Sequence, residues 1–186
     1  MHIEPTILPE VKLIRPSVHG DDRGFFQELY RAGTYREAGI DAVFVQDNWS
    51  HSRRGVLRGM HFQWPHPQAK LVWAVHGEIL DVAVDVRRGS PSFGRWVAVR
   101  LSGENHHQLF VPEGFAHGFC VLSESVDFMY KCSDVYHPEC DRGFRWNDPA
   151  VGIEWPLADP ELSAKDRDSL LLAALPPEHL PEYEGG

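Results

Sequence analysis

Cysteine is scarce in this chain of 186 residues, which has three: Cys120, Cys132 and Cys140. An odd number of cysteines without a C-x-x-C pair predicts neither a disulfide framework nor a zinc ribbon, and it is typical of a reducing compartment. Residues 1–5 have no basic segment followed by an apolar one, so they predict no signal peptide. We therefore expect a cytoplasmic protein with free thiols.

Long apolar runs and basic charge are also lacking. The longest strictly apolar run is residues 170–175, whereas a membrane-spanning helix needs about 20 residues, so we expect no membrane residence. Lys and Arg total 18 against 27 Asp and Glu, which gives a net charge of −9. Residues 139–186 contain 11 acids and 4 bases and therefore carry −7 of it. A chain this acidic is not expected to bind nucleic acid through its phosphates.

The chain does contain a regular series of short predicted strands. Its length suits one domain, and 42% hydrophobic and 24% charged residues are ordinary for a globular protein. Runs rich in β-branched and aromatic residues recur about every ten residues, which is typical of an all-β sandwich or barrel. The predicted strands are residues 69–75, 78–86, 96–101, 108–111, 119–122 and 126–131. In the second run Leu80, Val82 and Val84 share one face. Asp81 and Asp85 lie on the other.

Two helices are predicted outside this series. Residues 34–38 form a short one that Gly39 ends, and residues 163–175 form another. The second begins at Ser163 with Asp166 three residues later, which resembles a capping box. Residues 176–186 form either a surface strap or a frayed end.

Arg58 is the first candidate for chemistry, because it lies between glycines in an apolar stretch. We expect it to be half-buried, and a half-buried arginine needs an anionic partner such as a phosphate or carboxylate. Strict alternation would put Arg58 and His61 on opposite faces of a strand. Both can line one pocket only if Gly55 or Gly59 marks a bulge or bend.

The chain contains eleven histidines, which suggests the hypothesis of a metal site. Residues 110–119 resemble the second motif of the cupin barrels, Pro-x-Gly-x-x-His, with His117 in the ligand position. The first cupin motif, however, needs two histidines one residue apart, and His61 has none at that spacing. His66 lies between prolines and is a poor substitute, so a metal-free cupin is favoured. His117 then either contacts a ligand or is a satisfied core histidine.

Polar residues at strand spacing give further candidates. Gln46 and Asn48 share one face of a predicted strand over residues 42–50, and Phe26 and Glu28 share one face of another over residues 24–30. Arg23 lies just before the latter.

Lys70 and Tyr130 each permit two interpretations. Apolar neighbours could desolvate Lys70 and shift its pKa, or it is an ordinary edge lysine. Tyr130 is either a core aromatic or an acid.

Seven segments, taken in order, resemble the dTDP-4-dehydrorhamnose 3,5-epimerase family from about Ile7 to Leu171. They are residues 22–26 (DRGFF), 45–48 (VQDN), 55–63 (GVLRGMHFQ), 81–85 (DVAVD), 112–119 (PEGFAHGF), 146–149 (WNDP) and 162–166 (LSAKD). The resemblance implies a cupin-type jelly-roll barrel with short flanking helices and a C-terminal helical appendage. It also implies a homodimer in which an N-terminal strand adds to the partner's sheet.

One domain over residues 1–186 then has three parts. The N-terminal strands, including the one expected to add to the partner's sheet, occupy about residues 1–50. The barrel occupies about residues 51–150. The C-terminal helical segment and tail occupy about residues 151–186.

The resemblance also assigns roles to eleven residues. His61 would be the general base, oriented by Asp166, and Tyr130 the acid on the opposite face of the sugar. Lys70 would stabilise an enolate oxygen. The expected substrate-binding residues are Arg23 and Arg58 at the diphosphate, Gln46, Asn48, Phe26 and Glu28 around the nucleotide and sugar, and His117 near the ketone. Phe26 and Glu28 are the residues that the partner chain would supply to this site.

The implied reaction is inversion of a dTDP-4-keto-6-deoxy sugar at C3 and C5, with no metal or other cofactor. The alternatives are an epimerase that inverts only one of these carbons, a keto-isomerase, a catalytically silent sugar-nucleotide binding protein and a metal-dependent oxygenase. The chain departs from the family pattern at Ala69, at Trp49 and in the loop that begins at Trp64. We expect Trp49 and Trp64 to narrow the pocket.

Overall fold

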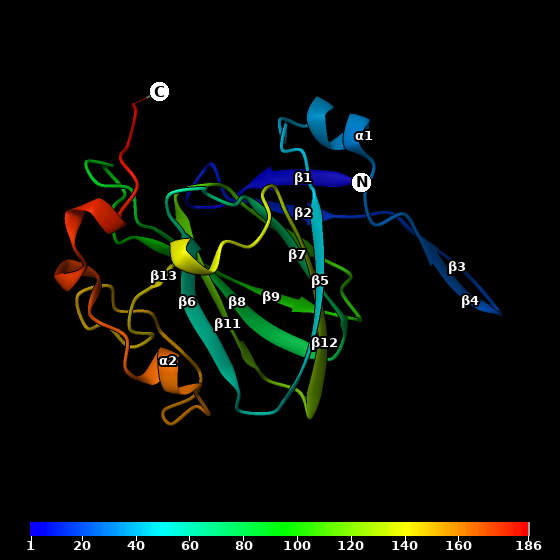
Figure 1. Ribbon diagram of the computed structural model, residues 1–186. Helices are drawn as coiled ribbons and strands as arrows, with labels where there is room; N and C mark the ends of the chain where they lie inside the picture. Colours follow the sequence, from blue (N-terminus) through cyan, green and yellow to red (C-terminus); the bar gives the residue numbers. More distant parts are fainter. Residues whose placement is uncertain (186) are drawn as a thin grey trace.

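Two antiparallel sheets face each other in the computed structural model, which describes residues 1–185 (Figure 1). The six-stranded sheet has the order β1 (His2–Pro5), β2 (Lys12–Arg15), β10 (Gln108–Val111), β7 (Lys70–His76), β12 (Ser125–Cys132) and β5 (Gln46–Arg53). The five-stranded sheet has the order β13 (Asp141–Gly143), β6 (Leu57–Gln63), β11 (Phe115–Val121), β8 (Glu78–Asp85) and β9 (Trp96–Ser102). The prediction of an all-β, cupin-type jelly roll is confirmed.

The main core lies between the sheets, and β8 shows how the sequence builds it. Ile79 and Ala83 point inward and pack against residues of the six-stranded sheet. Val82 and Val84 point outward, where they join a second apolar cluster. The predicted alternation is therefore confirmed, and both faces of the strand are buried.

The C-terminal segment covers the outer face of the five-stranded sheet. The predicted helix over residues 163–175 is wrong: the chain forms α2 (Ala164–Arg167) and then separate 3₁₀ turns, η2 (Leu172–Ala174) and η3 (Pro177–His179). Tertiary contacts interrupt it, because the backbone amide of Leu172 donates to Asp148 Oδ2 at 2.7 Å and Leu172 is buried in the second cluster. The predicted N-terminal cap of this helix at Ser163 is confirmed, since the backbone amide of Asp166 donates to Ser163 Oγ.

The tail forms a strap rather than a frayed end. Leu180 is 6% exposed, and Arg88 donates its backbone amide to Pro181 O at 2.7 Å. Tyr183 donates back to Arg88 O at 2.9 Å. Gly186 lies outside the described residues.

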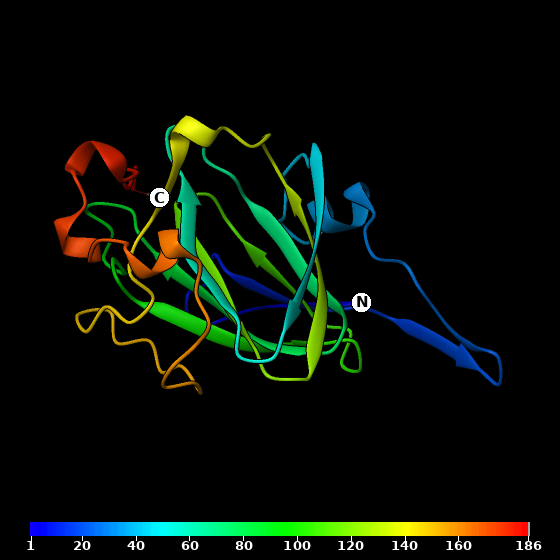
Figure 2. The same cartoon turned by 60° about the horizontal axis from the view of Figure 1, so that its bottom comes forward.

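An N-terminal hairpin projects from the barrel (Figures 1 and 2). It consists of β3 (Val18–Asp21) and β4 (Gly24–Gln27), so the strand predicted over residues 24–30 is shorter than expected. The chain turns back at Leu29, whose carbonyl accepts hydrogen bonds from Tyr35 and Gln108. The predicted short helix is confirmed as α1 (Ala32–Glu37), and β5 begins four residues later than the strand predicted from residue 42.

The three cysteines are buried free thiols. Over residues 1–185, no helix is both long and apolar enough to cross a membrane.

Candidate active site

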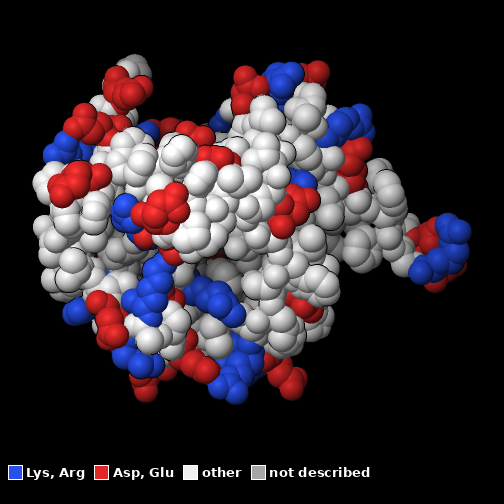
Figure 3. All heavy atoms as spheres, viewed as in Figure 1, with Lys and Arg blue, Asp and Glu red and all other residues white. Residues whose placement is uncertain are grey.

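Two adjoining cavities of about 490 and 400 Å³ open between the sheets. His61, Lys70, Tyr130 and Lys165 line both of them. In the space-filling view, Lys and Arg side chains gather on the lower part of the face in Figure 1's orientation, although the chain as a whole is acidic (Figure 3). The cavities therefore suit an anionic ligand.

Strand register explains why distant residues share the wall formed by the six-stranded sheet. Cys132 of β12 pairs with Gln46 of β5 and with Lys70 of β7. Two residues earlier, Tyr130 pairs with Asn48. Because residues two apart on a strand face the same side, these side chains all point into the cavities.

A bulge shapes the opposite wall. On β6 and β11, His61 pairs with His117 and Arg58 pairs with Phe119, so β6 has one more residue than β11 between the two pairs. Of the two positions considered for a bulge or bend, Gly55 and Gly59, the bulge lies at Gly59, and it brings Arg58 and His61 to the same cavity. Gly59 has φ +136°, and a Cβ there would lie 2.7 Å from Gly118 Cα, so the position requires glycine.

Arg58 is exposed rather than half-buried as expected. Its Nε donates to Ser52 Oγ at 3.0 Å. It lines the larger cavity and has no carboxylate partner among the described residues, so its guanidinium is left to solvent.

His61 and Asp166 form a pair suited to general base catalysis. Their Nε2 and Oδ1 atoms are 2.5 Å apart, and the side chains are 33% and 3% exposed. Burial opposes ionisation of Asp166, but hydrogen bonds from His61, Ser163 and Gly59 outweigh it and lower the pKa of the carboxyl. Asp166 therefore stays ionised and accepts Nε2–H, which leaves Nδ1 of His61 as the proton acceptor.

Burial shifts the pKa values of two groups on the other wall: the shift suits the expected role of Tyr130 and opposes the charged form that the role of Lys70 requires. Burial raises the pKa of Tyr130, so the phenol keeps its proton and can act as an acid. It lowers the pKa of Lys70, and the neighbouring Cys132 and Asp141 only partly oppose this effect.

His117 both lines the cavity and has a buried partner, so the two interpretations of it are compatible. Its Nε2 lies 2.9 and 3.0 Å from the carboxylate oxygens of Asp81. Burial raises the pKa of Asp81, which is fully buried, and His117 offsets part of the effect. Asp81 therefore holds the imidazole of His117 in place. The alternation in β8 separated Asp81 from the face of Val82 and Val84 but gave it no role.

Lys165 is a basic cavity residue that sequence reasoning missed. It lines both cavities and forms an ion pair with Asp141 of β13. The signal was present, because Lys165 lies in the LSAKD segment beside Asp166.

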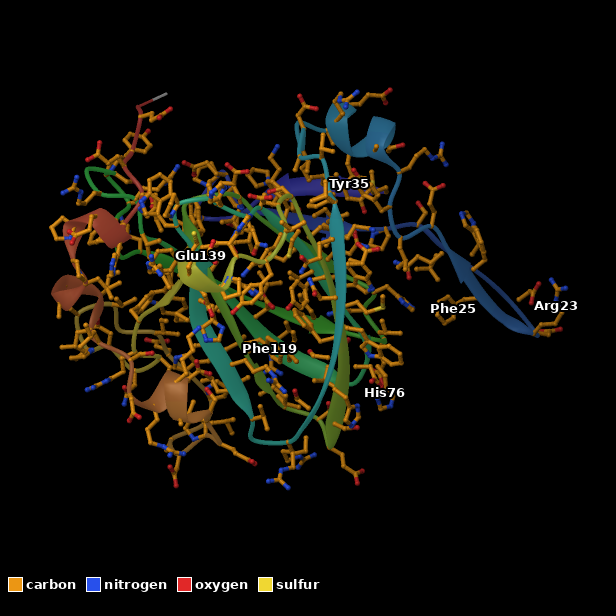
Figure 4. The ribbon with its side chains drawn as sticks, in the orientation of Figure 1. Arg23, Phe25, Tyr35, His76, Phe119 and Glu139 are labelled. Carbon is orange, nitrogen blue, oxygen red and sulfur yellow. The ribbon has the colours of Figure 1, made fainter. Side chains whose placement is uncertain are left out.

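Three predicted residues do not line the two cavities between the sheets. Arg23 is at the tip of the projecting hairpin (Figure 4), where its side chain is 89% exposed and pairs with Asp21. Phe26 is 70% exposed on the same hairpin, and Glu28 pairs with Arg31.

The expectation that Trp49 and Trp64 narrow the pocket is wrong for this chain. Trp49 lies on the outer face of β5, where Nε1 donates to Asp127 Oδ1, and it is 72% exposed. Trp64 packs against the second apolar cluster. Neither departure from the family pattern touches the cavity walls.

Comparison with known proteins gives consistent matches. The family model for dTDP-4-dehydrorhamnose 3,5-epimerase matches residues 5–174. The dTDP-4-dehydrorhamnose 3,5-epimerase of Pseudomonas aeruginosa is 55% identical over 168 residues, which cover 89% of this chain and 93% of that protein. The one from Neisseria gonorrhoeae is 54% identical over 89% of this chain, which spans only 51% of that longer protein. Among solved structures, a Legionella pneumophila dTDP-6-deoxy-D-glucose-3,5-epimerase in complex with dTDP-4-keto-L-rhamnose has a TM-score of 0.97 and 50% identity, with 99% of each chain covered.

Proposed function

The chain belongs to the dTDP-4-dehydrorhamnose 3,5-epimerase family, and from this premise we propose that it converts dTDP-4-keto-6-deoxy-D-glucose to dTDP-4-keto-L-rhamnose. It is thus an isomerase that inverts C3 and C5. One structural observation supports the proposed proton transfers: His61 and Tyr130 come from opposite sheets and line the same cavities. A base and an acid on opposite walls can remove a proton from one face of a sugar ring and return one to the other.

The C4 ketone makes the C–H bonds at C3 and C5 acidic. Nδ1 of His61 takes the proton, the electron pair of the C–H bond forms a C=C bond, and the carbonyl π pair moves to the oxygen as an enolate. When the enolate collapses, its carbon takes the proton of the Tyr130 hydroxyl on the opposite face, which inverts the centre. The imidazolium and phenolate then exchange protons with water, and the cycle repeats at the second carbon.

Lys70 is placed to stabilise the enolate. It extends from the same wall as Tyr130 into both cavities. Because the site is partly shielded from water, a fixed cation beside developing negative charge stabilises the transition state more than it would in bulk water. The transfers are redox-neutral, so they need no nicotinamide, and Lys70 is the group proposed to stabilise the enolate oxygen.

Replacing Arg58 with alanine is expected to weaken dTDP binding by about 10- to 150-fold, because a hydrogen bond to a charged group contributes roughly 1.5–3 kcal/mol. Isothermal titration with dTDP measures the change. Arg54→Ala is the matched control, since Arg54 is an exposed neighbour outside the cavities that donates to Ser123 O. Equal affinities of the Arg58 variant and the wild type would remove Arg58 from the diphosphate site.

The proposed assembly is a homodimer in which each hairpin completes the partner's site. Phe25 and Phe26 are 64% and 70% exposed on the hairpin, and Trp49 and Val75 are 72% and 52% exposed on the six-stranded sheet. Apolar surface of this kind usually marks an interface. We expect light scattering to give twice the 21.2 kDa of one chain, whereas a monomer at micromolar concentration would contradict the proposal.

A complementation experiment tests the exchange of residues directly. Phe26→Ala and His61→Asn are each expected to be nearly inactive alone. Mixed and refolded together, they should regain activity, because the His61-containing site then receives an intact hairpin from the other chain. A dimer without recovery would show that Phe26 serves no neighbouring site.

The free, buried thiols support a cytoplasmic location for this enzyme.

The reaction itself is tested by the configuration of the product. NMR of the product from dTDP-4-keto-6-deoxy-D-glucose should show both C3 and C5 inverted. A product inverted at one centre would instead identify the alternative, a monofunctional C3 or C5 epimerase.

A further inference from the structure

A cluster of metal-ligand side chains lies outside the catalytic cavities. His66 belongs to the loop between β6 and β7, and Asp134 and His137 belong to the loop between β12 and η1 (Pro138–Cys140). One ligand atom from each residue lies within 4.8 Å of the other two. Among residues 1–185, this is the one group of His, Cys, Asp or Glu that meets this criterion.

The distances within the cluster are close to those of a coordination shell. Asp134 Oδ2 lies 3.6 Å from His66 Nδ1 and 3.7 Å from His137 Nε2. Nitrogen and oxygen ligands bonded at about 2.0–2.1 Å to a tetrahedral zinc ion are roughly 3.3 Å apart. The distances from Asp134 thus need to shorten by only a few tenths of an ångström. The rings of His66 and His137 are stacked, with centroids 4.4 Å apart and planes 19° apart, so one ring must also turn before both imidazoles can point a nitrogen at a shared ion.

The surroundings hold the ligands in place. Gln63 ties the two loops together, since its Nε2 donates to His66 O and Val135 O and its Oε1 accepts the backbone amide of His137. Glu139 Oε1 lies 3.6 Å from Nδ1 of His137, the nitrogen that faces away from the cluster. A metal-ligating imidazole usually donates its other N–H to an outer-shell carboxylate, and Glu139 is the carboxylate placed to accept it after an approach of about half an ångström.

We propose that His66, Asp134 and His137 bind one divalent ion of borderline softness, with zinc the best fit. Two imidazoles and one carboxylate suit Zn²⁺, and solvent completes the fourth position because the side chains of His66, Asp134 and His137 are 56%, 35% and 28% exposed. None of the three residues lines the catalytic cavities. The ion would thus be structural: it would join two loops whose neighbours Gln68 and Tyr136 line the smaller cavity.

Titration of chelator-treated protein with Zn²⁺ by isothermal calorimetry tests the proposal. The wild type should bind one Zn²⁺ per chain, and His66→Asn and Asp134→Asn should each weaken binding more than about tenfold. Asparagine suits position 66 because His66 has φ 65°, a conformation that asparagine tolerates. His2→Asn is the matched control: His2 is also exposed and lies 3.3 Å from a carboxylate, that of Glu4, but belongs to no group of three ligands.

A second measurement needs no variant. On addition of Zn²⁺ to wild-type protein, the imidazole NMR signals of His66 and His137 should shift together and saturate at one equivalent. Absence of one-to-one binding, equal affinity in the His66 or Asp134 variants, or shifts confined to other histidines would each overturn the proposal.

Discussion

Replacing His61 with asparagine is expected to reduce turnover by about 10²–10⁴-fold, the usual contribution of a general base, while dTDP still binds. The asparagine amide can donate a hydrogen bond toward the ionised carboxylate of Asp166, as Nε2 does now, but it cannot accept a proton from carbon. The diphosphate contacts are proposed for Arg58 and for the partner's hairpin, so the nucleotide affinity does not depend on His61. Steady-state kinetics give the loss of turnover, and calorimetry with dTDP gives the affinity.

The matched control is His2→Asn, the same substitution on β1 at a residue outside the cavities. It should leave turnover unchanged. Wild-type turnover in the His61 variant would remove this residue from the role of base, and equal loss of turnover and dTDP binding would indicate a structural role.

Replacing Tyr130 with phenylalanine is expected to separate proton exchange from inversion. His61 can still remove a proton from its own face and return one there, so substrate in heavy water should continue to take up deuterium. Formation of inverted product should fall by about 10²–10⁴-fold, because no acid remains on the opposite wall. NMR follows both quantities in one sample.

The phenylalanine ring preserves the packing of Tyr130 against the main core. A loss of activity in this variant therefore reports the missing hydroxyl rather than a disturbed fold. Inverted product at the wild-type rate would show that another group is the acid.

The strands were predictable because their signals are local. In β8, the alternation of Val82 and Val84 with Ala83 fixes which side chains face each apolar cluster. The requirement that Arg58 and His61 share a pocket pointed to an irregularity at Gly55 or Gly59, and the register of β6 and β11 has it at Gly59. The C-terminal helix failed because its end depends on Leu172 reaching Asp148, a contact between distant parts of the chain.

The sequence indicated which strands carry the candidate site residues, but not the chemical role of each residue. Tyr130 and Lys70, on adjacent strands, needed the resemblance to assign their roles, because each residue alone permits an ordinary structural interpretation. Lys165 was missed because its place in the cavity arises from the packing of α2 rather than from strand periodicity. Arg23 was expected at the diphosphate, but no pattern within one chain shows that the hairpin carrying it projects away from the barrel.

The central claim is that one base and one acid on opposite walls invert both carbons beside the ketone. Incubation of the wild-type enzyme with dTDP-4-keto-6-deoxy-D-glucose in heavy water, followed by NMR, tests it most directly. We predict deuterium at both C3 and C5 of the doubly inverted sugar. Deuterium confined to one carbon after prolonged incubation would contradict the claim and show that the ring presents only one of its acidic positions to His61 and Tyr130.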